Sequence, residues 1–148
     1  MITVSDINQD EENYVWWLTI MPDVLLRLAE LPKALRESLD YSISSLDAIE
    51  KYLMENYSFE EMKDVKNKYA RDLFARYIGE TFRKNLENCY WTIDLEDRKN
   101  VFYGLPVLIV KEKQNVAPIS PYFLVIALLD RQKGNFLSSI LKNIQKTN

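Results

Sequence analysis

The sequence predicts one α+β domain over residues 1–148, with a helical N-terminal half, a small antiparallel sheet of about three strands and closing C-terminal helices. Two observations predict this class. Apolar residues recur at helical spacing until Asn88, and the period changes to alternation from Cys89 onward. The composition agrees, because 3 glycines and 5 prolines allow few tight turns, while 47% apolar residues suffice for a core.

The first helix is expected from Asp6 to Leu31, with Ser5 or Asp6 as its N-cap and acidic residues in its first turns. Pro22 should break or restart it, because a proline ring removes a backbone donor and clashes with the preceding turn. Pro32 marks its end. The stretch "KALRES" predicts a short helix, and "LDYSIS" a connector.

Two further helices are indicated by capping patterns. Ser44 with Asp47 resembles a capping box, and the apolar residues after it follow one helical stripe. Ser58 with Glu61 is a stronger capping box, and it predicts a third helix from Phe59 to about Leu86.

This third helix is apolar on two faces, so it either lies at the centre of the fold or covers a partner. One face holds Ala70, Leu73, Phe74, Tyr77 and Thr81, and the other holds Ala75, Ile78, Phe82 and Leu86. Gly79 lies beside the second face and costs about 1 kcal/mol relative to alanine in a helix. The Ala75–Gly79 spacing therefore suggests that another backbone approaches closely there.

The strands follow the third helix. "CYWTIDLED" alternates, with Trp91 and Tyr90 on opposite sides, and "EDRKN" is a polar turn. "VFYGLPVLIV" predicts one or two strands, and Pro106 places an edge or a bulge there, supported by Gly104.

The C-terminal segment returns to helix. Ser120 followed by Pro121 is a typical helix start, and Gly134 is expected to end this helix. The last helix should bury a stripe formed by Phe136, Leu137, Ile140, Leu141 and Ile144.

Composition restricts the function. The chain has no histidine and 1 cysteine, so Cys/His zinc sites and Ser-His or Cys-His nucleophile pairs are excluded. A magnesium or calcium site built from carboxylates alone stays open, but no EF-hand loop is present, and we expect no metal or cofactor. A net charge of −3, with acids mixed among the lysines and arginines, argues against nucleic acid as a partner. The N-terminus shows no targeting pattern and the apolar runs are too short to span a bilayer, so we expect a cytoplasmic protein.

Glu80 allows three interpretations. It can be a boundary glutamate that pairs with Arg76 or Lys84 at helical spacing, or that caps a backbone donor of the following strand. It can contact a partner. It can also be a catalytic carboxylate, although general-acid work needs a second carboxylate or a shifted pKa, and the sequence shows neither.

The turn after the first strand is the second candidate. Asp94, Glu96 and Asp97, with Arg98 beside them, could steer a basic partner, or they could be a solvated hairpin turn. Together with Glu80 they form the predicted partner-binding residues. Aromatic side chains such as Trp91 could anchor a partner or belong to the core. Trp16 and Trp17 are adjacent, so one helix cannot bury both equally.

Several of these motifs occur together in one order. "SLDAIEKYL", "ARYIGETFRKNL", a strand with Trp91 and "YGLPVLI" resemble a broad group of small, mostly uncharacterised bacterial proteins with a leucine/glutamate helix, a Tyr-x-Gly-Glu helix and a tryptophan strand. Some relatives in that group lie near toxin–immunity systems. The resemblance covers roughly residues 40–145. It departs from the group at "ENCY", where relatives often have Gly-Gly, so the turn into the first strand is expected to differ.

The resemblance implies a non-catalytic protein-binding module, and one form of it is an immunity-type inhibitor that binds a bacterial toxin domain. Two alternatives remain. The chain could be a structural or regulatory subunit that forms homo-oligomers through the two-sided third helix, or a hydrolase that uses carboxylates.

Overall fold

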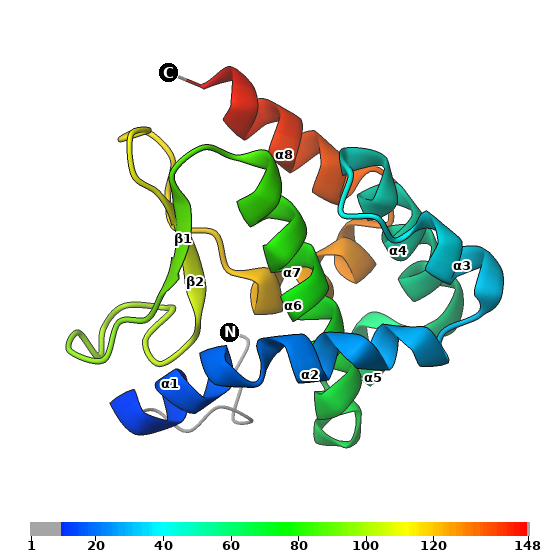
Figure 1. The fold of residues 1–148 in the computed structure, drawn as a ribbon, viewed down its shortest axis with the longest axis horizontal. Helices are drawn as coiled ribbons and strands as arrows, with labels where there is room; N and C mark the ends of the chain where they lie inside the picture. Colours follow the sequence, from blue (N-terminus) through cyan, green and yellow to red (C-terminus); the bar gives the residue numbers. More distant parts are fainter. Residues whose placement is uncertain (1–9, 148) are drawn as a thin grey trace.

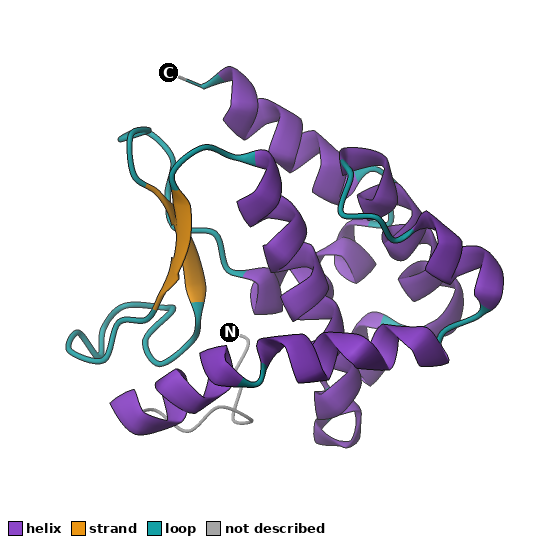
Figure 2. Cartoon of the chain, in the orientation of Figure 1, coloured by secondary structure: helices purple, strands orange, loops and turns teal. Residues whose placement is uncertain are grey.

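The α+β class is confirmed in a computed structural model, which describes residues 10–147. Helices make up most of the molecule, and the sheet lies at one side of it (Figures 1 and 2). The sheet has 2 strands, so the prediction of about three was slightly too high. In chain order the described elements are α1 (Glu11–Thr19), α2 (Met21–Leu25), the 3-10 helix η1 (Leu26–Glu30), α3 (Lys33–Ser38), α4 (Ile43–Asn56), α5 (Phe59–Lys63), the 3-10 helix η2 (Val65–Asn67), α6 (Lys68–Asn85), β1 (Cys89–Thr92), β2 (Val107–Val110), α7 (Pro121–Arg131) and α8 (Phe136–Lys146).

The N-terminal helical region breaks where Pro22 predicts a break. α1 ends at Thr19, and Pro22 lies in the first turn of α2, where a missing backbone N–H costs little. The carboxylate of Asp10 caps α1 by accepting the Asn13 N–H at 2.7 Å. The predicted caps Ser5 and Asp6 lie outside the described residues, but α1 begins only at Glu11, later than predicted, because Asp10 is extended.

The predicted start of the second helix was two residues late. Ser42, not Ser44, caps α4, and its hydroxyl accepts the Ser45 N–H at 3.2 Å. Several serines in "YSISSLD" can serve as an N-cap, so the sequence leaves the start ambiguous. The preceding residue, Tyr41, has a positive φ of 63°, which turns the chain sharply into the helix.

The predicted third helix is divided. Its capping box is confirmed, with both Ser58–Glu61 bonds present, but the helix stops at Lys63. Asp64 is extended, and its carboxylate accepts the Lys66 N–H to begin η2. Aspartate competes with helical backbone bonds in this way, and the break needs neither glycine nor proline.

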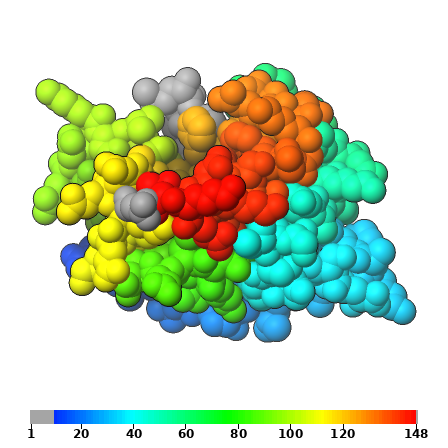
Figure 3. All heavy atoms as spheres, turned by 90° about the horizontal axis from the view of Figure 1, so that it is seen from above, coloured from blue at the N-terminus to red at the C-terminus, as the bar shows by residue number. Residues whose placement is uncertain are grey.

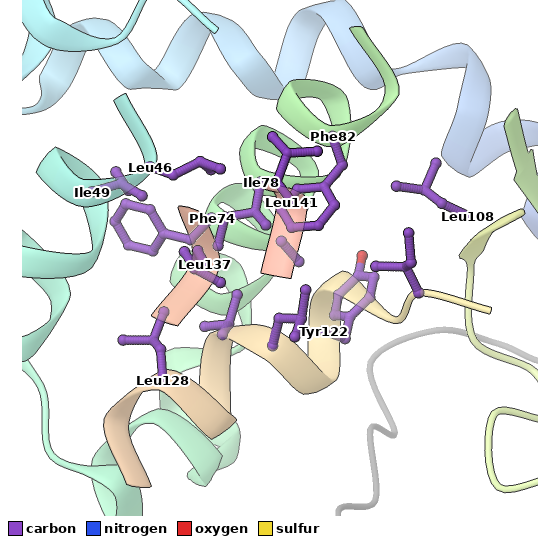
Figure 4. Packing of buried hydrophobic residues seen from close by; sticks show 14 of the residues in the cluster. Leu46, Ile49, Phe74, Ile78, Phe82, Leu108, Tyr122, Leu128, Leu137 and Leu141 are labelled. Carbon is purple, nitrogen blue, oxygen red and sulfur yellow. The ribbon is translucent and has the colours of Figure 1, made fainter. Parts of the chain in front are cut away.

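α6 is the central helix. It packs against α2, α4, α5, α7 and β1, so this chain's own elements cover both of its apolar faces. Figure 4 shows Phe74, Ile78 and Phe82 of α6 pointing into a cluster that α4, α7 and α8 complete. The two-sided pattern therefore marks a helix at the centre of the fold.

Gly79 is a packing position, but a side chain approaches it and not a backbone. A Cβ at Gly79 would overlap the indole ring of Trp91 and lie 3.0 Å from the ring of Pro121. The absence of a side chain thus lets the sheet and the start of α7 approach α6.

The strands pair in antiparallel register, with Trp91 opposite Leu108 and Thr92 opposite Val107. In addition, Leu108 of β2 forms an isolated antiparallel bridge with Ile119, which precedes α7. β1 ends at Thr92, earlier than the alternation to Leu95 predicts, and residues 93–106 form a long connection.

The C-terminal helices close the core. Ser120 caps α7 as predicted, but α7 ends at Arg131, before Gly134, and its C-cap Gln132 adopts the left-handed conformation. Glu50 of α4 is fully buried, and its carboxylate accepts the N–H groups of Phe136 and Leu137 at 3.0 and 2.9 Å. It satisfies the free donors at the start of α8 and therefore holds this helix on α4. Figure 3 shows α8 lying between α4 and the chain that precedes α7.

Candidate protein-contact surface

The connection formed by residues 93–106 is held in shape by Asp94. The Asp94 carboxylate accepts the N–H groups of Glu96 and Asp97 at 2.9 and 3.1 Å. It also accepts the side-chain amide of Asn100 at 2.9 Å, and the Asp94 carbonyl accepts the Gly104 N–H at 2.9 Å. The bond from Asn100, followed by those from the two backbone N–H groups, lowers the pKa of Asp94. Asp94 is therefore an ionised organising residue of this loop.

The tip of the loop is also fixed by local bonds. Asp97 accepts the Lys99 N–H, and the Asn100 side chain accepts the Phe102 N–H, each at 3.0 Å. The Arg98 guanidinium lies over the ring of Tyr103, 5.5 Å from its centre. These contacts act within the loop, and the edge-on packing of Phe102 against Phe123 of α7 adds a contact to the rest of the fold.

Glu96, Asp97 and Arg98 are exposed at this tip. Within residues 10–147, neither the Glu96 nor the Asp97 carboxylate takes part in an ion pair. The predicted acidic cluster therefore divides, because Asp94 organises the loop while Glu96 and Asp97 present their charge to solvent.

A groove of about 460 Å³ lies between this loop, the outer face of the sheet and the start of α1; we call it the acidic groove. Its carboxylates come from Glu11, Asp94 and Glu96, and its other polar groups from Thr92 and Asn100. Its apolar lining comes from Ile93, Leu95, Phe102, Val107, Ile109 and Pro118. Sequence reasoning missed Glu11, because nothing local in the sequence indicates that α1 meets the loop.

A buried polar network holds α1 in place. The Trp17 indole N–H donates to the Tyr122 hydroxyl at 2.8 Å, and that hydroxyl donates to Asp72. Arg76 donates to the Trp17 carbonyl at 2.8 Å and to Asp72 at 3.0 Å, and its guanidinium covers the Trp17 ring. Burial, followed by the charge of Asp72, raises the pKa of Tyr122 well above its usual value. The network links α1 to α6 and α7, and so fixes the position of Glu11.

The adjacent tryptophans have different environments, as expected for neighbours on one helix. Trp17 is 5% exposed, whereas Trp16 is 61% exposed. Trp91 is partly buried and packs edge-on against Trp17, with ring centres 4.9 Å apart. Trp91 therefore packs at the edge of the core, and Trp16 lies at the surface.

Glu80 contacts partners other than those predicted. Its carboxylate accepts two bonds from the Arg83 guanidinium, at 2.6 and 3.0 Å, and the Trp91 indole N–H at 2.9 Å. Arg76 pairs with Asp72 instead, and Lys84 lies over the ring of Tyr41. Glu80 therefore bonds to β1 through the Trp91 side chain, and not through a backbone N–H as predicted.

The electrostatics of Glu80 follow from these contacts. Burial acts to raise the pKa of its carboxyl group, but the bonds from Arg83 and Trp91 and the charges of Arg83 and Lys84 outweigh it. The pKa is therefore lower than usual, and Glu80 is ionised at neutral pH. Burial also raises the pKa of Cys89 to about 11, so that its sulfur stays a neutral thiol.

The structure does not bring all the predicted residues together. Asp94, Glu96, Asp97 and Arg98 belong to the loop, whereas Glu80 lies on α6 beside a shallow pocket that Tyr41 and Lys84 also line. Glu80 is a link between α6 and β1, and the loop is the contact candidate that remains.

The described residues 10–147 hold neither a cluster of metal ligands nor a membrane-spanning helix. No group of three or more Cys, Asp or Glu side chains in this range is placed to hold a metal ion. In the same range, no helix has both the length and the apolar character needed to cross a membrane.

No family model, curated protein or solved structure matches this chain. The resemblance to small bacterial proteins near toxin–immunity systems therefore stays a prediction.

Proposed function

We propose that this chain is a non-catalytic, cytoplasmic protein-binding module whose contact surface is the loop 93–106 together with the acidic groove. The observation that carries the proposal is the bonding around Asp94. A loop fixed before binding loses little conformational entropy when a partner docks, and so favours recognition.

The charge of the loop supports a basic partner. Glu96 and Asp97 are exposed and make no ion pair within the described part of the chain. Such charges raise the rate of encounter with a basic surface more than they raise affinity. An immunity-type inhibitor that binds a toxin domain is one form of this function.

The two alternatives receive less support. α6 has both apolar faces covered by this chain's own elements, so self-association through it would need a different surface. The lowered pKa of Glu80 does not suit the general acid of a hydrolase, because a general acid must hold a proton near neutral pH.

The proposal is tested by capturing proteins from the native host on three immobilised forms of the chain. These are the wild type, the loop variant Glu96→Gln/Asp97→Asn, and the control Glu12→Gln/Glu87→Gln. The control removes the same charge at exposed glutamates outside the loop and the groove. We expect that the wild type and the control retain the same host protein in similar amounts. The loop variant should retain at least about threefold less of that protein than the wild type does. Equal retention by all three forms would contradict the proposal, and so would the absence of any specifically retained protein.

A further inference from the structure

The acidic groove combines apolar walls with carboxylates at its rim. Val107 and Ile109 of β2 contribute to the walls, while Glu11 of α1 and Glu96 of the loop contribute acidic groups. Its volume of about 460 Å³ is within the range of ligand pockets in proteins. A side chain with an apolar stem and a charged end would satisfy both parts at once.

The negative charge of the groove favours a side chain whose charged end is positive. Neither Glu11 nor Glu96 forms an ion pair within residues 10–147, and the described lining of the groove contains no lysine or arginine. Asp94 adds a third negative charge, although loop donors already occupy its carboxylate. All formal charges among the described lining residues are therefore negative, which favours a cation over an anion in the groove.

We infer that the acidic groove receives an arginine side chain from a basic segment of the partner; this inference rests on the proposed function. The planar guanidinium can bond to carboxylates in pairs, and Glu11 and Glu96 reach the groove from two different elements. The aliphatic stem of the arginine lies against Val107 and Ile109. Arginine is also enriched among the residues that contribute most to protein interfaces.

The test uses a defined probe and does not need the natural partner. The blocked peptide acetyl-Ser-Gly-Arg-Gly-Ser-amide is titrated into the ¹⁵N-labelled full chain at low salt, and amide chemical shifts are followed by NMR. A peptide with citrulline in place of arginine has nearly the same shape without the charge. We expect saturable shifts at Thr92, Val107 and Ile109 with the arginine peptide, and binding at least about fivefold weaker with citrulline.

Charge-matched variants separate the groove from the general acidity of the chain. Glu11→Gln/Glu96→Gln should weaken binding of the arginine peptide at least about fivefold, while Glu12→Gln/Glu87→Gln should change it less than about twofold. Glu12 neighbours Glu11 on α1 but does not line the groove. Equal weakening by both variants would overturn the inference, as would shifts confined to other surfaces or equal binding of the citrulline peptide.

The inference and the proposed function fail in different ways. A partner whose retention depends on Glu96 and Asp97, together with an arginine peptide that does not bind, would reject the arginine site and leave the binding function standing. If the arginine peptide binds at the groove but the wild type and the loop variant retain the host partner equally, the proposed function is rejected.

Discussion

At the scale of single residues, the helix caps depend on neighbours within one turn, whereas the contacts of Glu80 depend on tertiary packing. Ser58 with Glu61 and Ser120 with Pro121 are caps that depend on neighbours within one turn, and both are present. The predicted partners of Glu80 were wrong. Its carboxylate bonds to Arg83, which was not among the expected partners, and to Trp91, which lies across a helix–strand junction. Side-chain partners are a tertiary property, so helical spacing alone could not decide between Arg76, Arg83 and Lys84.

Gly79 gives a prediction at this scale. Gly79→Leu should lower the free energy of unfolding by about 1–3 kcal/mol, because the new side chain overlaps Trp91 and Pro121, which outweighs the gain in helix propensity. Denaturant unfolding measures the effect. The penalty should shrink in a Trp91→Phe background, where the ring is smaller. Unchanged or increased stability of Gly79→Leu would show that this position is open.

Glu80 gives a prediction of pH dependence. Its pKa is lower in the folded chain than in the unfolded chain, so the unfolded state binds more protons in the acidic range. The stabilisation from Glu80 is therefore present at neutral pH and is lost as the pH falls below about 5. Glu80→Gln should cost about 1 kcal/mol at pH 7 and progressively less toward pH 3. A cost that does not vary with pH would contradict this assignment.

At the scale of elements, the sequence predicted most helices and misplaced several boundaries. The long third helix was expected to be continuous, but Asp64 ends α5 by bonding to the chain after it. β1 stops at Thr92 because the next polar residue, Asp94, organises the loop and does not extend the ladder. In both places an aspartate side chain competes with regular backbone bonding, which a pattern of apolar residues does not reveal.

The loop itself is tested through Asp94. Asp94→Ala removes the acceptor of the Glu96, Asp97 and Asn100 donors. We expect faster amide hydrogen exchange at Glu96, Asp97 and Gly104, while global stability falls by less than about 1 kcal/mol because the core is untouched. Heteronuclear NOE values should fall over residues 93–106. Exchange that stays as slow as in the wild type would mean that other contacts fix the loop.

At the scale of the whole molecule, the parts of the candidate site come from distant segments. α1 is held on the core by the buried network of Trp17, Arg76, Asp72 and Tyr122. The sheet carries the loop, so that Glu11 and Glu96 line the same groove. Figure 1 shows α1 and the loop together at the same end of the molecule. The sequence predicted the carboxylates of the loop but not this meeting, because it depends on the packing of the entire chain.

The most direct test of the binding function is the salt dependence of association with the partner captured from the host. Rates are measured by stopped flow at low and high ionic strength for the wild type, Glu96→Gln/Asp97→Asn and Glu12→Gln/Glu87→Gln. We predict that the loop variant associates about three- to tenfold more slowly than the wild type at low salt, and that the difference disappears at high salt because ions screen the exposed charges. The control variant should stay close to the wild type. If the loop variant associates as fast as the wild type at low salt, or if the control slows equally, the loop 93–106 is not the contact surface.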